Sequence, residues 1–253
     1  MKIGSTTAVQ QPPAAGPLAR YRDVEAAIDS LVEEHIVRGR FMQALHGGEF
    51  TLQQIGEFAL QYGYYSRHFP LVLGAAIAAM EPDDAWWVPI VDNLWDEGGR
   101  GNPEFYHSRL FSSFLQSACP EVAAHPERAR THPVSPAVRL AVDTFLCFLR
   151  QASPLEAMAA IGFGSEFFAG KVMGLIGEGL QHPAYNAARK LNVRFWLIHA
   201  DDHEPRHYTL CKEILRQFAK PEELKTIYRS GATIALSEAR MYEELYQHLM
   251  AMK

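Results

Sequence analysis

Most of the information about the fold is carried by one stretch, residues 93–111, which reads NLWDEGGRGNPEFYHSRLF. A helix is predicted to end at Glu97, because the glycines that follow favour a loop. The same glycines let the next helix, predicted to begin at Pro103, pass close to the first. His107 lies four residues before Phe111 on the expected inward side of that helix. The stretch therefore places a carboxylate and an imidazole on neighbouring helices.

Both of these side chains also have a purely structural interpretation. A glutamate at a helix end is often solvated, and an isolated core histidine is more often satisfied by one hydrogen bond than bound to a metal. The residues around Glu97 and His107 leave both interpretations open.

Outward from this stretch, apolar residues recur at helical spacing, and alternating β-branched runs are almost absent. A first helix has an apolar face from Val24 to Ile36 and ends at Gly47-Gly48, and a second starts at the N-cap Thr51 and runs past Pro70. An all-α fold is predicted, with one domain over residues 18–253 behind a mobile lead-in, residues 1–17. The further helices are expected at residues 86–95, 103–118, 136–151, 154–180, 183–203, 206–218 and 221–251.

Composition and charge exclude several classes of function. The chain has 253 residues, 48% of them hydrophobic, and a formal net charge of −5, so no nucleic-acid or membrane partner is expected. Three cysteines without a CxxC pair argue against a disulfide framework and a structural zinc site. The sequence shows neither a signal peptide nor an uninterrupted apolar run of about 18 residues, which predicts a cytoplasmic protein.

Two further helices carry ionisable residues on apolar faces. Glu166 is the one charged residue between Ala159 and Gly170, and a buried carboxylate needs a cation or several donors to stay ionised. His199 follows an aromatic segment, and His203 comes one turn later. This spacing suits a metal-binding pair, although such pairs also occur on exposed helix faces. Long antiparallel helices bury ligands of this kind on facing surfaces.

The spacing of these residues resembles the haem-oxygenase-like di-iron oxidases, whose motif NLxDExGxGxxxxxHxxLF is matched from Asn93 to Phe111. Glu166 is similar to the next glutamate of that family, and residues 195–199 resemble the start of its last ligand helix. The resemblance covers about residues 20–250. It implies a haem-oxygenase-like bundle of seven or more helices, related in fold to thiaminase-like and pyrroloquinoline-quinone-synthase-like proteins. It also implies that the catalytic iron ligands are Glu97, His107, Glu166 and His199.

The sequence departs from the family pattern in two places. The last ligand helix of the family reads HxxxDxxH, whereas here the Asp position is His203 and the last His position is Arg206, a cation that cannot bind a metal. The family also has a carboxylate on its second helix, where the polar residues here are Gln61, Arg67 and His68. One or two iron ions are therefore expected, and the second site lacks part of its ligands.

Pro205 offers a way to restore the second site. A proline interrupts a helix, and a change of phase there would bring His207 inward as a ligand in place of Arg206. The nearby carboxylates that would replace the missing ligand are Asp201, Asp202 and Glu204. Alternatively, Pro205 occupies the first turn of a new helix, with Asp202 as its cap and His207 on the surface.

Three classes of function follow from these features. A non-haem iron oxidase or oxygenase would activate O2 at the carboxylate and histidine ligands and oxidise a small amino-acid-like or fatty-acid-like metabolite. A metal-free enzyme of the same fold would carry out cofactor-independent oxidation or C–N hydrolysis with His68, His199, His203 and Arg206. A non-catalytic small-molecule binding protein would keep the fold alone. The iron enzyme is the main prediction.

Aromatic residues accompany the candidate ligands and predict a mainly apolar substrate cavity. Arg67 or Arg206 would hold an anionic group of the substrate, such as a carboxylate. The expected partners are thus a small-molecule substrate and O2, and the fold is compatible with a homodimer. The predicted substrate-binding residues are Tyr65, Arg67, His68, Phe163, Trp196 and Arg206.

Overall fold

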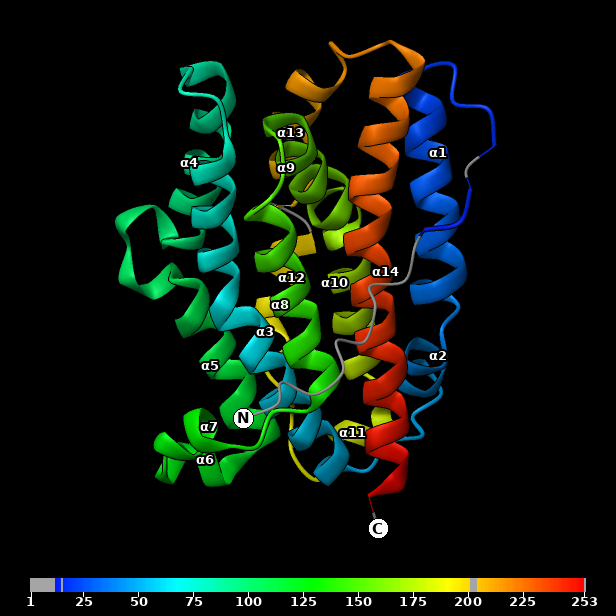
Figure 1. Cartoon of the computed structure of the whole chain (residues 1–253). Helices are drawn as coiled ribbons and strands as arrows, with labels where there is room; N and C mark the ends of the chain where they lie inside the picture. Colours follow the sequence, from blue (N-terminus) through cyan, green and yellow to red (C-terminus); the bar gives the residue numbers. More distant parts are fainter. Residues whose placement is uncertain (1–11, 15, 201–203, 253) are drawn as a thin grey trace, which may run out of the picture.

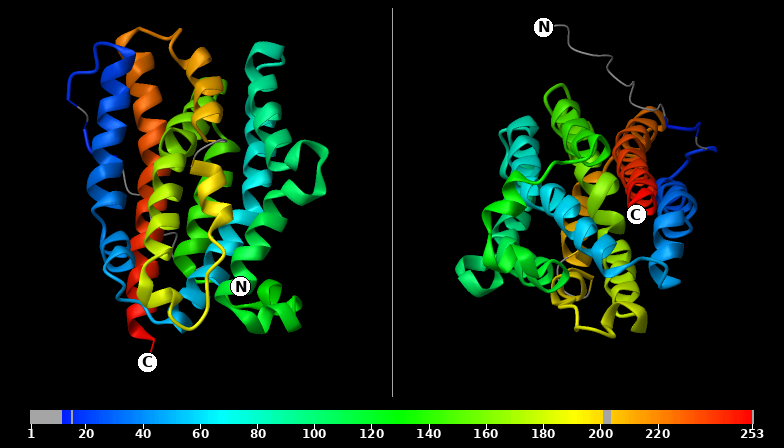
Figure 2. Two further views of the ribbon diagram at one scale, coloured as in Figure 1. Left: turned by 180° about the vertical axis from the view of Figure 1, so that it is seen from behind. Right: turned by 90° about the horizontal axis from the view of Figure 1, so that it is seen from below.

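The computed structural model describes residues 12–14, 16–200 and 204–252, and within these ranges it consists of helices and connecting segments without a strand. The long helices stand side by side as a bundle (Figure 1), which Figure 2 shows from behind and from below. The prediction of an all-α bundle of seven or more helices is confirmed.

The helices are, in chain order, α1 (Tyr21–Val32), α2 (Arg40–His46), α3 (Leu52–Ala79), α4 (Asp84–Glu97), α5 (His107–Ala118), α6 (Pro120–Ala124), α7 (Glu127–Thr131), α8 (Pro136–Leu149), α9 (Pro154–Ile161), α10 (Phe167–Leu180), α11 (Pro183–Asn186), α12 (Arg194–Ile198), α13 (Glu204–Leu215) and α14 (Pro221–Ala251). The π-helical segments are η1 (Glu33–Val37) and η4 (Gly162–Glu166), and the 3-10 segments are η2 (Gly99–Gly101) and η3 (Pro103–Phe105).

Local sequence signals explain where the helices begin. Thr51 caps α3 as predicted: its Oγ1 accepts from the Gln54 backbone N–H at 3.2 Å, and the Gln54 side chain accepts from the Thr51 N–H at 2.7 Å. Ser153 and Glu156 cap α9 in the same way. Proline stands at the start of α8, α9 and α14, where its missing N–H has no helical partner to lose. The caps therefore fix the positions of the long core helices.

The core lies where α14 crosses the middle of the bundle and packs on α1, α8, α9 and η4. The contact between η4 and α14 is close because glycines face it. A Cβ added at Gly164 would lie 2.6 Å from Cβ of Ile234, and one added at Gly231 would overlap the side chain of Phe163. This packing holds η4, the segment that ends at Glu166, rigidly against the longest helix.

Three predicted helices are interrupted in the structure, two of them outside the glycine-rich loop. The first does not run unbroken to Gly47-Gly48, because the chain turns at Gly39, where a Cβ would lie 2.9 Å from the His35 carbonyl oxygen. The helix predicted over residues 183–203 is also wrong in its middle, because residues 187–193 are not helical. There the Asn186 side chain accepts from the Leu191 N–H at 2.9 Å and donates to the Leu180 carbonyl oxygen at 2.9 Å. These side-chain bonds compete with helix continuation.

The connection between α4 and α5 is the glycine-rich loop, and it brings the two helices together as its composition predicts. Gly99 and Gly101 have φ of 63° and 80°, and a Cβ at Gly99 would lie 2.6 Å from the Phe105 carbonyl carbon. The helix predicted from Pro103 is split, since η3 ends at Phe105 and α5 begins at His107. His107 therefore lies on the first turn of α5, beside the end of α4.

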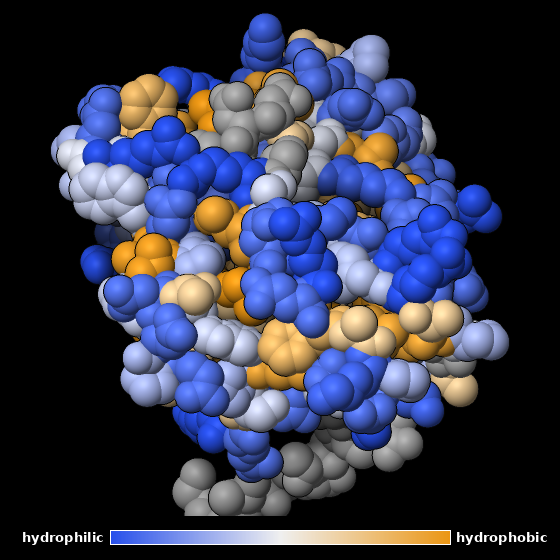
Figure 3. Space-filling model, turned by 90° about the horizontal axis from the view of Figure 1, so that it is seen from above, coloured by the Kyte–Doolittle hydropathy of each residue, from blue (hydrophilic) through white to orange (hydrophobic). Residues whose placement is uncertain are grey.

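The sequence predicted no membrane-spanning helix, and the burial of the most apolar helical stretch can be compared with that prediction. One helical stretch, Pro154–Leu180, is long and apolar enough to cross a membrane, but 67% of its 18-residue window is buried inside the bundle, which is how a core helix behaves. Seen from above, the surface is mostly hydrophilic with small hydrophobic patches between (Figure 3). The three cysteines, Cys119, Cys147 and Cys211, are free thiols in the structure.

Candidate metal centre

Glu97 and His107 form the first contact of the site. Glu97 is the last residue of α4, and its Oε2 makes an ion-pair contact with Nδ1 of His107. The Glu97 side chain is only 3% exposed. Burial alone would disfavour its charge, but the attraction of His107, with His199 and His207 adding to it, lowers the pKa of Glu97 to about 2. The carboxylate is thus ionised in the interior.

His199 joins this pair from the segment that follows α12. Its Nδ1 lies 2.7 Å from the Phe195 carbonyl oxygen, which can only accept, so Nδ1 donates this hydrogen bond and Nε2 is the nitrogen left to face the site. That Nε2 lies 3.1 Å from Nδ1 of His107. Nε2 of His107 is in turn 2.7 Å from Oγ of Ser66 on α3. Backbone and hydroxyl partners therefore orient both imidazoles so that their inner nitrogens face each other.

The inner atoms of Glu97, His107 and His199 converge on one point. One ligand atom from each residue lies within 4.8 Å of the other two. A carboxylate and two imidazoles at this spacing are the donor set of non-haem Fe(II) sites that leave coordination positions open. The side-chain hydrogen bonds that fix the outer imidazole nitrogens are also typical of metal ligands. The three residues fit an iron ion.

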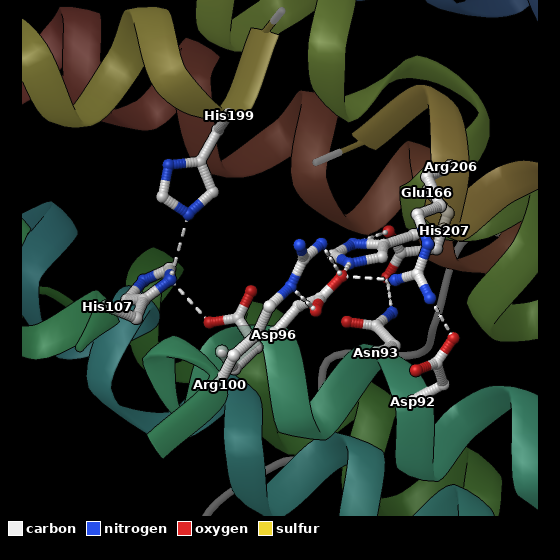
Figure 4. A network of polar contacts seen from close by, with 10 residues as sticks. Asp92, Asn93, Asp96, Arg100, His107, Glu166, His199, Arg206 and His207 are labelled. Atoms are coloured by element: carbon white, nitrogen blue, oxygen red, sulfur yellow. Dashed lines mark hydrogen bonds and ion pairs between the residues drawn. The ribbon is translucent and has the colours of Figure 1, made fainter. Parts of the chain in front are cut away.

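A second polar group lies beside the first and is built around Glu166 at the end of η4 (Figure 4). Glu166 Oε1 accepts from Nδ2 of Asn93 at 2.9 Å, and Oε2 lies 3.4 Å from Nδ1 of His207. Nε2 of His207 lies 3.2 Å from Oδ2 of Asp96. Oε2 of Glu166 and Oδ1 of Asn93 are buried without a hydrogen bond in the described part of the chain. These oxygens are available to a second cation.

Arg206 is turned toward the carboxylates of α4. Its guanidinium pairs with Asp92 and Asp96, and Arg100 Nε also donates to Asp96 at 2.6 Å (Figure 4). Burial would raise the pKa of Asp96, but Arg100, His207 and Arg206 together lower it to about 2. The cationic side chain at the family's last histidine position is therefore neutralised by carboxylates of α4. The prediction that Arg206 holds a substrate anion is corrected accordingly.

His207 is buried, and Pro205 stands in the first turn of a helix. Each of the two alternatives for Pro205 is therefore correct in one part and wrong in the other. Helix α13 begins at Glu204, so Pro205 stands in its first turn, yet His207 is 1% exposed and not on the surface. The interval from His199 to His207 is one residue longer than in HxxxDxxH, and His199 and Ala200 are π-helical, a geometry that absorbs one extra residue. The predicted ligand His203, together with Asp201 and Asp202, lies outside the described residues, as does the side chain of Glu204.

One known family matches the part of the chain that contains this site. The family model described as iron-containing redox enzyme, of the haem-oxygenase type, matches residues 56–239, more than half of the chain. The chain belongs to the haem-oxygenase-like family of iron-containing redox enzymes. The matched span includes every residue of the two polar groups around Glu97 and Glu166.

Several proteins of similar sequence are named pyrroloquinoline-quinone synthase. The protein of that name from Rhodopseudomonas palustris (strain TIE-1) is 30% identical over 152 residues, which cover 58% of this chain and 56% of the relative. The one from Cereibacter sphaeroides (strain KD131 / KCTC 12085) is 32% identical over 127 residues, covering 49% of this chain and 46% of the relative. This member of the iron-containing redox enzymes thus matches about half the length of these relatives.

Solved structures share the fold at low sequence identity. A CADD-like protein of unknown function from Nostoc punctiforme matches with a TM-score of 0.72 at 12% identity, covering 91% of this chain and 99% of that one. A domain with a heme oxygenase-like fold from Shewanella denitrificans matches with a TM-score of 0.66 at 14% identity, covering 90% and 91%. A TenA homolog from Pseudomonas syringae pv. tomato gives 0.65 at 12%, covering 94% and 100%. The predicted relationship of folds is confirmed.

A small cavity adjoins the group of Glu97 and His107. Its volume is about 40 Å³, enough for a few water molecules. The ligand side is formed by Glu97, His107 and Ser66, and the apolar side by residues of α3 and α10. The polar residues on the remaining wall are Tyr62, Tyr65, Ser165, Glu238 and Tyr242.

Glu238 on α14 is a site residue that the sequence analysis missed. Tyr65 donates its hydroxyl to Glu238 Oε2 at 3.2 Å, and Tyr242 makes a second hydrogen bond to the carboxyl group. Burial, with a smaller contribution from the charge of Glu166, raises the pKa of Glu238 to about 7. The signal was present in the sequence, because Glu238 interrupts the apolar face of α14 just as Glu166 interrupts its own helix.

Of the predicted substrate-binding residues, Tyr65 lines the cavity and the others lie elsewhere. Arg67 is exposed and donates to the Ala129 carbonyl oxygen at 3.3 Å, so it does not reach the cavity. Nδ1 of His68 lies 2.6 Å from the Tyr64 carbonyl oxygen on its own helix. The prediction placed both residues correctly on α3 but on the wrong face of it.

Phe163 and Trp196 are core residues. Phe163 packs against the rings of Tyr21, Phe167 and Tyr208, and Trp196 against those of Phe58, Tyr62 and Phe114 among others. Both are fully buried away from the cavity. Their sequence positions, three residues before Glu166 and His199, suggested the cavity, but both rings are occupied by packing against other aromatic residues of the core.

Proposed function

We propose that the protein is a non-haem iron-dependent oxidase or oxygenase that activates O2 and oxidises a small metabolite in the cavity beside Glu97. The observation that carries this proposal is the convergence of Glu97, His107 and His199, whose ligand atoms lie within 4.8 Å of one another in the interior. The family to which the chain belongs supports the same conclusion.

The first iron ion would be held by Glu97, His107 and His199, and a second by Glu166 and His207. Ferrous iron with carboxylate and imidazole ligands and open positions supplies the activation of O2. The Phe195 carbonyl and Ser66 orient the imidazoles of the first group, and Asp96 orients His207 in the second. Asn93 holds the Glu166 carboxylate with one oxygen directed inward.

The second group offers fewer ligands than the first. Its described members are one carboxylate and one imidazole, whereas the first group has a carboxylate and two imidazoles. A metal site with fewer protein ligands binds more weakly, so the two ions would be held with unequal affinity. We therefore expect one tightly bound iron ion and one that is lost readily on dialysis.

A metal-free enzyme of the same fold is the second candidate, because Glu238 and the paired histidines also form an acid–base set. The carboxyl group of Glu238 has its pKa raised to about 7, near the value that suits proton transfer at neutral pH. The sequence relatives named pyrroloquinoline-quinone synthase support a role in biosynthesis under either candidate.

The iron content of the protein decides between the candidates. Protein purified from iron-supplemented cells is expected to contain one to two equivalents of iron by elemental analysis. Glu97→Gln and His199→Ala should lose the tightly bound equivalent, because each removes one of three ligands. Glu104→Gln is the matched control, since Glu104 is an exposed glutamate on the neighbouring segment η3, paired with Arg109. Iron at background level in the wild type, or full iron in both ligand variants, would reject the iron site.

A further inference from the structure

The cavity is lined by a second carboxylate, Glu238, which is not one of the converging metal ligands, and neither Lys nor Arg accompanies it in the described part of the chain. Glu238 is 7% exposed, and its carboxyl group is hydrogen-bonded to the neutral hydroxyls of Tyr65 and Tyr242. Neither Lys nor Arg occurs among the described residues that line the cavity. A buried carboxylate without a cationic partner is costly, which is why buried charges in proteins are normally paired.

The groups that face this cavity carry an excess of negative charge. Tyr62 and Tyr65 come from α3, Tyr242 lies on the same helix as Glu238, and Glu97 and His107 come from α4 and α5. Glu166 of η4 acts on Glu238 through its charge. The two proposed iron ions would neutralise Glu97 and Glu166, but Glu238 is not among their ligands and would keep its charge.

The remaining lining suits a short organic cation. Phe69 and the rings of Tyr62, Tyr65 and Tyr242 surround the space together with Val172 and Met173. Aromatic faces attract ammonium groups, and a carboxylate among such rings adds a charged hydrogen-bond acceptor. A substrate carboxylate in the same place would meet Glu238 with a like charge. The volume of about 40 Å³ restricts the occupant to a small molecule.

We propose that Glu238 binds the ammonium group of an amine substrate whose carbon chain lies against Phe69, Val172 and Met173, next to the metal ligands. The inference rests on the proposed function in that it takes this cavity as the substrate site. It replaces an anionic substrate held by Arg67 or Arg206, since Arg67 is exposed on α3 and Arg206 is paired with Asp92 and Asp96.

Binding of such an amine near neutral pH has a measurable consequence for protons. Because the pKa of Glu238 is raised to about 7, about half of the carboxyl groups are protonated at pH 7. An ammonium ion favours the ionised form, so its binding must release protons from the protonated fraction. Neutral and anionic molecules of the same length should release none.

The test uses isothermal titration calorimetry on the whole metal-free chain with ethylamine, ethanol and acetate at pH 7. The amine is expected to bind at least about tenfold more tightly than the alcohol, and acetate not at all, as one desolvated ion pair is worth on the order of that factor. Repeating the amine titration in buffers of different ionisation enthalpy should show net proton release.

Variants locate the ammonium group. Glu238→Gln should lose about tenfold or more in amine affinity and all proton release, while Glu244→Gln on the same helix, which pairs with Arg240 at the surface, should bind as the wild type does. Equal binding of amine and alcohol, unchanged affinity in Glu238→Gln, or a loss that follows Glu97→Gln instead would overturn the proposal. Proton release by the wild type tests it even if a variant does not fold.

The iron measurement keeps this proposal separate from the proposed function. Iron is determined on a different preparation and depends on Glu97 and His199, whereas the calorimetry is done without metal and depends on Glu238. Absent iron with selective amine binding would reject the iron enzyme and keep the ammonium site. Bound iron without amine selectivity would do the reverse.

Discussion

Oδ2 of Asp96 lies 3.2 Å from Nε2 of His207, and Nδ1 of the same ring lies 3.4 Å from Oε2 of Glu166. A carboxylate bonded to one imidazole nitrogen fixes the ring orientation and raises the basicity of the other nitrogen, an arrangement common at metal-binding histidines. Asp96 belongs to the same helical turn as Glu97, so α4 supplies both a ligand for the first group and the residue that orients the second.

Asp96→Asn should weaken the second iron ion selectively. The amide keeps the shape of the carboxylate but loses the charge that holds His207, and changes of this kind typically cost about 10- to 100-fold in metal affinity. Anaerobic titration with Fe(II) should show one equivalent unchanged and the other weakened. Asp92→Asn, which touches Arg206 alone among these residues, is the control and should leave both affinities unchanged. Equal weakening of both ions would contradict the assignment.

His207→Ala and Arg206→Ala, one residue apart, should differ in their effect on iron. His207 is buried beside Glu166, so its removal deletes a ligand and should leave about one equivalent of iron. Arg206 pairs with Asp92 and Asp96, so its removal should leave the iron content unchanged and lower the melting temperature slightly. Elemental analysis of both variants is sufficient. Loss of iron from Arg206→Ala but not from His207→Ala would show that the helix register differs in solution.

Glu166→Gln should retain the fold and lose the second iron ion. The amide conserves the volume of this buried side chain, and the charge it removes has no guanidinium or ammonium partner in the described structure that would be left unpaired. The far-ultraviolet circular dichroism should match that of the wild type, while the iron content falls by up to one equivalent. Wild-type iron content would instead assign Glu166 a structural role.

Glu238 should make the metal-free protein less stable as the pH rises. Its pKa is raised from 4.5 to about 7 in the folded state. Below pH 4.5 the carboxyl group is neutral in both states and does not change the free energy of unfolding. Between pH 4.5 and about 7 its ionisation favours the unfolded chain, and this penalty on folding is complete above pH 7. Glu238→Gln lacks this penalty. Between pH 5 and pH 8 it should gain on the order of 3 kcal/mol relative to the wild type in urea unfolding. Parallel stability curves for the two proteins would show that Glu238 does not titrate in this range.

The close packing of η4 on α14 predicts opposite effects for two glycine substitutions. Gly231→Ala would overlap Phe163 and should destabilise the protein by on the order of 2 kcal/mol. Gly74→Ala on α3 meets nothing within 4 Å and should stabilise it by about 0.4–1 kcal/mol through the unfolded state. Thermal unfolding measures both. If Gly231→Ala is neutral, η4 and α14 are farther apart than the structure shows, and the position of Glu166 changes with them.

The helical character of the chain could be predicted from its sequence because periodicity and caps are local properties. Thr51, Ser153 and the prolines that start α8 and α14 act within a few residues of themselves, so the starts of these helices were predictable. The boundaries that failed depend on side chains returning to the backbone, as Asn186 does, or on a turn such as that at Gly39.

The candidate ligands Glu97, His107, Glu166 and His199 could be named from the sequence because a charged side chain on an apolar helical face is itself a local anomaly. That His107 and His199 face each other at 3.1 Å depends on helices 92 residues apart, and only the tertiary structure decided it. Glu238 carried the same local signal, but its role depends on Tyr65 from another helix.

The direction of the side chains near Pro205 was decided by tertiary structure as well. Sequence spacing assigns Arg206 to a ligand position, because a continuous helix advances by a fixed angle per residue. In the structure Arg206 pairs with the carboxylates of α4, while His207 packs against Glu166. A sequence specifies which groups are present, whereas the phase between two helices depends on the packing of their neighbours, which no local pattern contains.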